Sequence, residues 1–131
     1  MLRAHAALTR ALDAQLVAEH GISLSSYEVL LFLADSSEGR MRMSELASSV
    51  LISRSGLTRL VDRLERSGLL RREPCGDDGR GYFATITAEG LDLFRAARRT
   101  HLAGVREMFL GRFSRAELRS LGSMWERLLT G

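Results

Sequence analysis

Residues 53–90 read SRSGLTRLVDRLERSGLLRREPCGDDGRGYFATITAEG, and this stretch decides the fold. Its first part predicts an amphipathic helix, because large apolar residues recur at the i, i+3, i+4 and i+7 positions of one helical face. These residues are Leu57, Leu60, Val61 and Leu64. Ser53 is suited to cap the start of the helix, and Ser67 with Gly68 is suited to end it.

A β-hairpin is predicted directly after this helix. Residues 69–73 (LLRRE) and 82–86 (YFATI) read as two short strands, and the second is rich in β-branched and aromatic residues. Residues 75–81 form the polar connection between them. Pro74, the only proline, fits the outer end of the first strand because it cannot donate a hydrogen bond to a sheet.

Two helices are expected at the start of the chain. Residues 2–20 carry apolar side chains at helical spacing, and Gly21 is suited to end that helix in a left-handed conformation. Ser25 and Glu28 have the spacing of a capping box, which predicts that a second helix begins at Ser25. Residues 29–34 (VLLFLA) are apolar nearly all round, so this second helix is expected to be deeply buried.

The residues between the second helix and Ser53 predict the rest of a helix-turn-helix. Residues 41–43 favour a very short strand. Ser44 is expected to cap a short helix over residues 45–50, and residues 51–52 would form the turn into the next helix. Two short helices joined this tightly, followed by a hairpin, are typical of a winged helix-turn-helix, which reads duplex DNA with one helix and the wing.

Two more helices are predicted after the hairpin. Thr87 is suited to cap a long helix over residues 88–112. Ser114 and Glu117 form a second capping box, which predicts a final helix. The apolar side of this final helix is expected to point inward and consists of Leu118, Leu121, Trp125 and Leu128.

The predicted fold class is mainly α, with an α+β winged helix-turn-helix inside one domain over residues 1–131. Residues 25–90 would form the DNA-binding core. The terminal helices, residues 1–20 and 88–131, carry more apolar surface than that core needs. Exposed apolar helix faces usually contact a partner, most often an identical subunit, so we expect a homodimer through both ends of the chain.

Composition and charge agree with a globular protein that binds a polyanion. The chain has 131 residues, 45% of them hydrophobic and 27% charged, and no apolar run is long enough to span a membrane. The N-terminus lacks a signal-peptide pattern, so we expect a cytoplasmic location and no membrane partner. The net charge is +3, and all 19 basic residues are arginine. Six of them lie between Arg54 and Arg72, where the only acids are Asp62 and Glu65.

The residues of this stretch resemble the MarR family of bacterial transcription regulators, over essentially the whole chain. The strongest likeness is the helix-and-strand segment 53–73 followed by D-x-R-x-x-x-A-x-I-T-x-x-G, which comprises Asp78, Arg80, Ala84, Ile86, Thr87 and Gly90. The chain departs from the family pattern at Gly79, where many members carry a basic residue. The resemblance implies a homodimeric repressor that is released from DNA by a small phenolic or aromatic ligand.

The candidate DNA-binding residues are Ser44, Ser53, Arg54, Ser55, Thr58, Arg59, Arg63, Arg72, Asp78 and Arg80. A helix in the major groove reads bases with its N-terminal turns, so Arg54 and Arg59 are the candidates for guanine contacts. Arg63 and Arg66 lie farther along, where they would meet phosphates or pair with the nearby acids. Arg80 would reach into the minor groove. The resemblance implies that Asp78 holds this arginine in place.

Other functions have weaker support in the sequence. The single cysteine, Cys75, offers a redox switch as an alternative, although its two acidic neighbours in sequence disfavour a thiolate. Three scattered histidines do not predict a metal site, and we expect no cofactor and no enzymatic activity. Tyr27 and Phe32 suit either the core or a ligand pocket. A winged-helix scaffold that binds another protein, without specific DNA binding, remains the alternative outside gene regulation.

Overall fold

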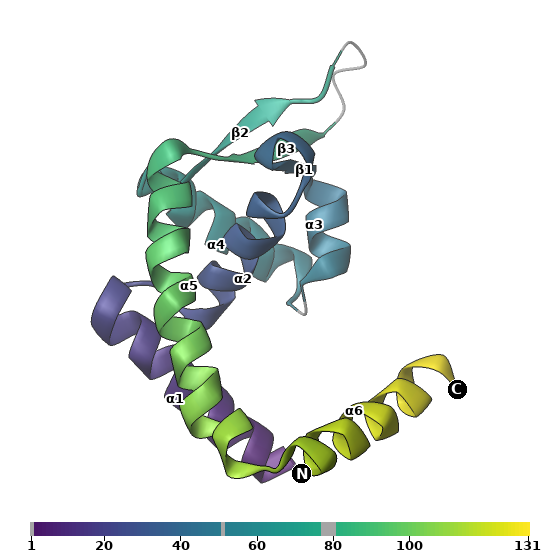
Figure 1. The fold of residues 1–131 in the computed structure, drawn as a ribbon. Helices are drawn as coiled ribbons and strands as arrows, with labels where there is room; N and C mark the ends of the chain where they lie inside the picture. The colour runs from purple at the N-terminus through teal and green to yellow at the C-terminus, as the bar shows by residue number, and fades with distance from the viewer. Residues whose placement is uncertain (1, 51, 77–80) are drawn as a thin grey trace.

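The computed structural model describes residues 2–50, 52–76 and 81–131. Within these residues the chain forms six α-helices, two 3₁₀ turns and three strands (Figure 1). Their order is α1 (Leu2–His20), α2 (Leu24–Ala34), η1 (Ser37–Gly39), β1 (Arg40–Arg42), α3 (Met43–Ser49), α4 (Arg54–Arg66), β2 (Leu70–Pro74), β3 (Tyr82–Ile86), α5 (Ala88–Met108), η2 (Leu110–Arg112) and α6 (Arg115–Thr130). The winged helix-turn-helix fold predicted from the sequence is confirmed.

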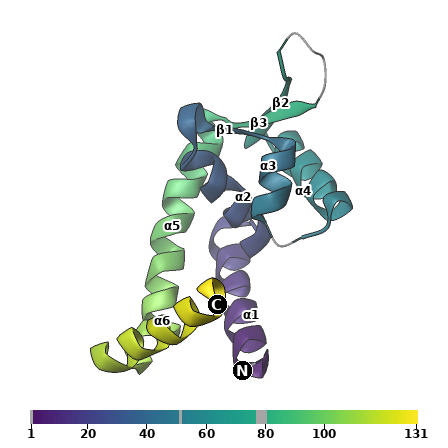
Figure 2. The same ribbon diagram turned by 90° about the vertical axis from the view of Figure 1, so that its right-hand side faces the viewer.

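The molecule has a winged core and a set of projecting helices. We use the name winged core for the segment from α2 to β3, which forms the upper part of Figure 1. The helices α1 and α5 pack against each other and descend from it. The helix α6 turns away from the end of α5 and lies apart from α4 in both views (Figures 1 and 2).

The sheet of the winged core has the order β1-β3-β2, with antiparallel pairing on both sides of β3. The wing is the β2–β3 hairpin. Pro74 pairs with Tyr82 at the outer end of the wing, and Leu70 pairs with Ile86 at the inner end. The proline therefore lies on an edge strand, where its missing N–H leaves no ladder bond unmade.

The buried residues form two clusters that share α2. One cluster fills the winged core and consists of Val29, Leu33, Leu46, Val50, Leu57, Leu60, Val61, Leu64, Leu70 and Ala84. The other joins α2 to α1 and α5 and consists of Leu16, Ile22, Tyr27, Leu30, Phe94 and Ala97. The all-round apolar character of α2 is explained by this position, because its opposite sides contact different clusters.

The predicted capping residue of α2 is wrong by two residues. The helix begins at Leu24 and is capped by Ser23, whose side chain accepts a hydrogen bond from the Ser26 amide at 3.0 Å. The Leu24 amide donates to Asp13 of α1 at 2.8 Å. These contacts satisfy the first amides of the helix, so the predicted capping box of Ser25 and Glu28 does not form.

The predicted cap of α3 is also wrong. Ser44 lies inside the helix, which begins at Met43, and the capping position is Arg42, whose side chain makes no capping hydrogen bond. The reason is the sheet. Arg42 still pairs with Phe83 as the last residue of β1, so the chain changes directly from strand to helix.

The caps of the last two helices are confirmed. Thr87 accepts a hydrogen bond from the Gly90 amide at 3.0 Å, and Ser114 and Glu117 form the predicted capping box. The helix α5 ends at Met108, four residues before the predicted end, because the chain tightens into η2.

The apolar side of α6 does not point into the protomer. Leu118 and Leu121 are half-buried, whereas Trp125 is 39% exposed and Leu128 is 72% exposed. The expectation that these side chains face inward is therefore wrong for the single chain. Their exposure leaves an apolar surface on a helix that projects from the body.

Across the described residues, no single helix is both long enough and apolar enough to cross a membrane. The pair α1 and α2 passes that test of length and composition only when taken together, and the two helices are bent by 79° at their junction.

Candidate nucleic-acid interface

The helix α4 is held in place through one buried face. Leu57, Leu60, Val61 and Leu64 are at most 5% exposed. At its start, the Ser53 hydroxyl accepts a hydrogen bond from the Gly56 amide at 3.0 Å, as expected for the cap. A Cβ atom at Gly56 would lie 3.0 Å from that hydroxyl oxygen, so the glycine leaves room for the cap.

The opposite face of α4 is polar, cationic and exposed. It consists of Ser53, Arg54, Ser55, Thr58, Arg59 and Arg63, all of which are exposed. The Thr58 hydroxyl donates to the Arg54 carbonyl at 3.0 Å. Among the residues that the structure describes, no carboxylate lies within ion-pairing distance of Arg54, Arg59 or Arg63. We call this set the exposed face of α4.

Ser44 adds a hydroxyl from α3. It is exposed on the first turn of that helix, and its carbonyl accepts a hydrogen bond from the Ser48 hydroxyl at 3.1 Å. In Figure 2, α3 and α4 lie next to each other on one side of the winged core, with the wing above them. Six of the candidate residues thus lie on α4 or its cap, and Ser44 lies on the adjacent helix.

Arg72 is engaged within the protein. Its guanidinium contacts Asp62 and donates to Glu65 at 3.0 Å, and its amide donates to the other Glu65 oxygen at 2.8 Å. This ionic clamp of Arg72, Asp62 and Glu65 joins β2 to α4. The hydrogen bond from the Arg72 amide, helped by the guanidinium, lowers the pKa of Glu65. Asp62 and Glu65 therefore pair with Arg72 and not with Arg63 or Arg66.

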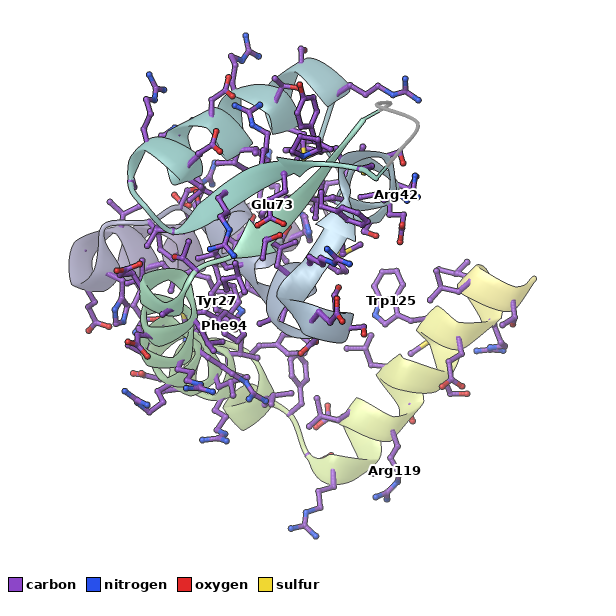
Figure 3. All side chains as sticks on the ribbon, turned by 90° about the horizontal axis from the view of Figure 1, so that it is seen from above. Tyr27, Arg42, Glu73, Phe94, Arg119 and Trp125 are labelled. Atoms are coloured by element: carbon purple, nitrogen blue, oxygen red, sulfur yellow. The ribbon has the colours of Figure 1, made fainter. Side chains whose placement is uncertain are left out.

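Two further arginines, which the sequence analysis missed, meet on the sheet. The guanidinium of Arg40 lies 4.3 Å from the centre of the Phe83 ring, and that of Arg42 lies 5.5 Å from the same ring. Figure 3 shows Arg42 on the side of the sheet away from Tyr27 and Phe94. The signal was present in the Arg40-Met41-Arg42 alternation, which places both arginines on the same face of a strand.

The comparisons with known proteins agree with this geometry. A model of the MarR family matches residues 20–81. AbsC, a MarR family transcriptional regulator from Streptomyces coelicolor, is 34% identical with a TM-score of 0.91, over 98% of this chain and 86% of AbsC. Sco3205, a MarR family regulator of the same organism solved in complex with DNA, is 37% identical with a TM-score of 0.92, over 98% and 80% of the two chains. This chain belongs to the MarR family.

A curated relative gives the same result for this MarR family member. The HTH-type transcriptional repressor YetL of Bacillus subtilis is 27% identical over 114 residues, which are 85% of this chain and 68% of YetL. The family resemblance inferred from the sequence is confirmed. The proteins that it matches are transcriptional regulators and not enzymes, as expected.

The wing holds the remaining candidates. Asp78 and Arg80 lie outside the described residues. Cys75 begins the predicted polar connection between the strands, but it is only 3% exposed, and its amide donates to the Gly81 carbonyl at 3.2 Å. The connection between the two strands therefore begins with a buried thiol and not with a solvent-exposed one.

Tyr27 belongs to the core of this MarR family member. It is 3% exposed and stacks on Phe94 with 5.5 Å between ring centres. Burial raises the pKa of its hydroxyl. Its ring also lies 4.7 Å from that of His101, whose pKa is lowered by burial. Phe32 is half-buried and packs against the cluster of the winged core. Among the described residues no group of three metal-binding side chains converges.

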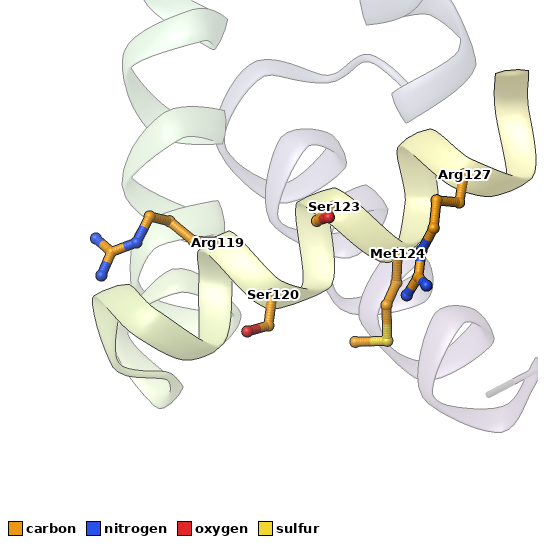
Figure 4. A pocket seen from close by; sticks show the side chains of 5 residues that line it. All are labelled: Arg119, Ser120, Ser123, Met124 and Arg127. Atoms are coloured by element: carbon orange, nitrogen blue, oxygen red, sulfur yellow. The ribbon is translucent and has the colours of Figure 1, made fainter.

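A shallow hollow of about 410 Å³ lies on α6, away from the candidate interface (Figure 4). Its lining consists of Arg119, Ser120, Ser123, Met124 and Arg127, all from this one helix. The hollow therefore belongs to a helix that projects from the body.

Proposed function

We propose that this MarR family member is a homodimeric repressor that binds a pseudo-palindromic DNA operator and is released by a small ligand. The observation that carries the proposal is the exposed face of α4. Its cations have no described carboxylate partner, while the other face of the same helix is anchored in the core. A rigid helix that presents arginine and hydroxyl groups suits the major groove of DNA.

The position of each side chain along α4 supports its proposed role. Arg54 and Arg59 lie in the first two turns, where they would fork onto guanine O6 and N7. The hydroxyls of Ser53, Ser55 and Thr58 suit phosphate oxygens or base edges. Arg63 lies one turn beyond Arg59 and would contact a phosphate. In the wing, we propose that Arg80 enters the minor groove and that Asp78 holds it there.

The exposed apolar side of α6 supports the dimer. Two copies joined through the terminal helices would place their α4 helices about one helical turn of DNA apart, so the operator would be a pseudo-palindrome of roughly 16–20 base pairs.

A small aromatic effector is proposed to bind between the projecting helices and the winged core. Two buried polar atoms near this region, Gln15 Oε1 on α1 beside Gly104 of α5 and His101 Nδ1 on α5, have no hydrogen-bond partner among the described residues. Buried polar atoms in this state are uncommon, and a ligand would satisfy them. Binding of the effector would favour dimer conformations in which the distance between the two α4 helices no longer matches the operator.

The first test is selection from a random duplex DNA library with the purified protein. The enriched duplex is then titrated at two salt concentrations. A single palindromic site whose affinity falls steeply with salt supports the proposal, because released counterions make phosphate contacts salt-dependent. A folded dimer that enriches no sequence and binds duplex DNA weakly and without salt dependence would support the scaffold alternative.

Substitutions on α4 test the roles of its arginines. Arg59→Ala should relax specificity at one operator position and cost about 1–3 kcal/mol of binding free energy against the preferred base. Arg63→Ala should weaken all duplexes about equally, since phosphates carry no sequence. Arg99→Ala, an exposed position on α5, is the control. A uniform loss on every sequence for Arg59→Ala would make that residue a phosphate contact.

A further inference from the structure

A cleft lies at the outer ends of the wing strands, at the base of the loop that joins them, and outside the exposed face of α4. Its volume is about 240 Å³, and its lining comes from the end of β1, the start of α3 and the two ends of the wing strands. The lining residues are Arg42, Met43, Ser44, Cys75, Gly81 and Tyr82. We call it the wing-base cleft.

Arg42 supplies the charge of this cleft. Strand pairing places it opposite Phe83, and its guanidinium lies over that ring. A guanidinium held against an aromatic face loses less conformational freedom when it binds an anion. Within the described part of the chain, no carboxylate lies within ion-pairing distance of Arg42.

Arg40 provides the contrast. It lies over the same Phe83 ring but pairs with Glu38 at 3.1 Å, and it does not line the cleft. The two arginines therefore share one aromatic support, and Arg42 also lines the cleft, with no ion-pair partner among the described residues.

The other polar groups of the cleft also favour an anion. Ser44 is exposed, and Tyr82 is 52% exposed, so both hydroxyls can donate to a ligand from solvent. None of the described lining residues is acidic. One guanidinium and two hydroxyls from three different elements match the oxygens of a phosphodiester.

We propose that the wing-base cleft binds one backbone phosphate of the operator, with Arg42 as the cation and Ser44 and Tyr82 as hydroxyl donors. This inference rests on the proposed DNA-binding function and adds Arg42 and Tyr82 to its contacts. The contact lies between α3 and the wing, so it would fix how the protein is seated along the DNA backbone and would carry no sequence information.

The test compares Arg42→Ala with its matched control Arg40→Ala, using the selected duplex and a scrambled one. Arg42→Ala should raise the Kd about tenfold or more on both duplexes, since a charge-assisted hydrogen bond is lost. It should also reduce the slope of log K against log salt by about 0.9, the value for one phosphate contact. Arg40→Ala should change neither quantity. Arg42→Lys, which keeps the charge, should keep the slope.

Replacing a single DNA phosphate by an uncharged analogue shows which phosphate the cleft contacts. Methylphosphonate is introduced one position at a time along the duplex, and at the contacted position the wild type and Arg42→Ala should bind equally. Tyr82→Phe should weaken binding to the normal duplex but not to that modified one. Circular dichroism and the thermal midpoint establish that each variant is folded.

The outcomes separate this proposal from the function on which it rests. An unchanged salt slope in Arg42→Ala, while Arg63→Ala lowers it, would overturn the phosphate role and leave the DNA-binding function intact. An equal loss of DNA affinity in Arg40→Ala and Arg42→Ala would also overturn it, since both variants remove an arginine from the Phe83 ring and only Arg42 lines the cleft. Salt-insensitive binding by the wild type would overturn both.

Discussion

Thr87 and Gly90 join the wing to α5 through contacts between single atoms. The Thr87 hydroxyl donates to the Gly68 carbonyl at 2.6 Å, and the Thr87 amide donates to the Leu69 carbonyl at 3.1 Å. A Cβ atom at Gly90 would lie 1.9 Å from that same Leu69 oxygen. The I-T-x-x-G part of the family pattern therefore has a steric reason, because only glycine lets α5 approach the end of α4 this closely.

Gly90→Ala should lower the free energy of unfolding by about 3 kcal/mol or more, because the new methyl group overlaps a backbone oxygen that cannot move alone. Thermal unfolding at one protein concentration measures the effect as a drop in Tm of roughly 10 °C. Gly122→Ala is the matched control. No atom lies within 4 Å of a Cβ there, so helix propensity should raise stability by about 0.5–1 kcal/mol. Equal effects at both glycines would contradict the steric explanation.

His101 should make stability depend on pH. Burial lowers its pKa below the ordinary value of 6.5. Between the folded and the unfolded pKa, the unfolded chain therefore binds more protons than the folded chain. The contribution of the neutral imidazole is thus complete above about pH 6.5 and is lost as the pH falls toward the folded pKa. Urea unfolding between about pH 5 and 7 should show a smaller pH slope for His101→Leu than for the wild type. His5→Leu, at an exposed site, should retain the wild-type slope.

At the scale of elements, α4 and the wing behave as one unit because of the ionic clamp. Arg72 is about one-third exposed, as is Glu65, so solvent weakens the pair without removing it. The clamp adds a polar contact between β2 and α4 to the packing of Leu70 and Ala84 in the buried cluster of the winged core.

Arg72→Met keeps most of the apolar stem of the side chain and removes the clamp. The free energy of unfolding should fall by about 1 kcal/mol, and operator affinity should fall with the salt slope unchanged, because Arg72 positions the wing and does not contact phosphate. Arg71→Met is the control for stability, since Arg71 pairs only with Glu73 on its own strand. A slope lowered by about 0.9 would instead assign Arg72 to the DNA contacts, as the sequence analysis had it.

The errors of the sequence analysis arise where distant elements meet. Features that depend on local residues were predicted correctly. They include the spacing of the apolar residues in α4 and the end of α1 at Gly21, whose φ is 69°. The start of α2 was not, because Asp13, eleven residues earlier, selects Ser23 over Ser25 by taking the Leu24 amide. The partners of Arg72 likewise depend on how β2 lies over α4, which no local pattern encodes.

At the scale of the whole molecule, α6 is the element least supported by its own chain. Leu128 and Leu129 are 72% and 86% exposed, and no residue of α6 is fully buried. A second copy of the chain is the partner that we propose for this surface. The stability of α6 would then depend on protein concentration.

Leu128→Glu combined with Trp125→Ser should produce monomers, because charge and lost apolar area both weaken the proposed interface. Sedimentation equilibrium measures the change in mass. Both positions are exposed in the protomer, so the far-ultraviolet circular dichroism of the winged core should persist. Thr58→Glu, on the exposed face of α4, is the control and should lose DNA binding while staying dimeric. A double variant that sediments like the wild type would place the dimer contact elsewhere.

The separation of α6 from α4 shapes how defects in this regulator would be inherited (Figure 2). A chain with a damaged α4 would keep the surface through which we propose that two copies pair. In a cell that carries both alleles, intact chains would form heterodimers with damaged chains, and each heterodimer would bind only half of the operator. Such an allele would be dominant, whereas an allele that destroys α6 would be recessive, because its product never meets the healthy one.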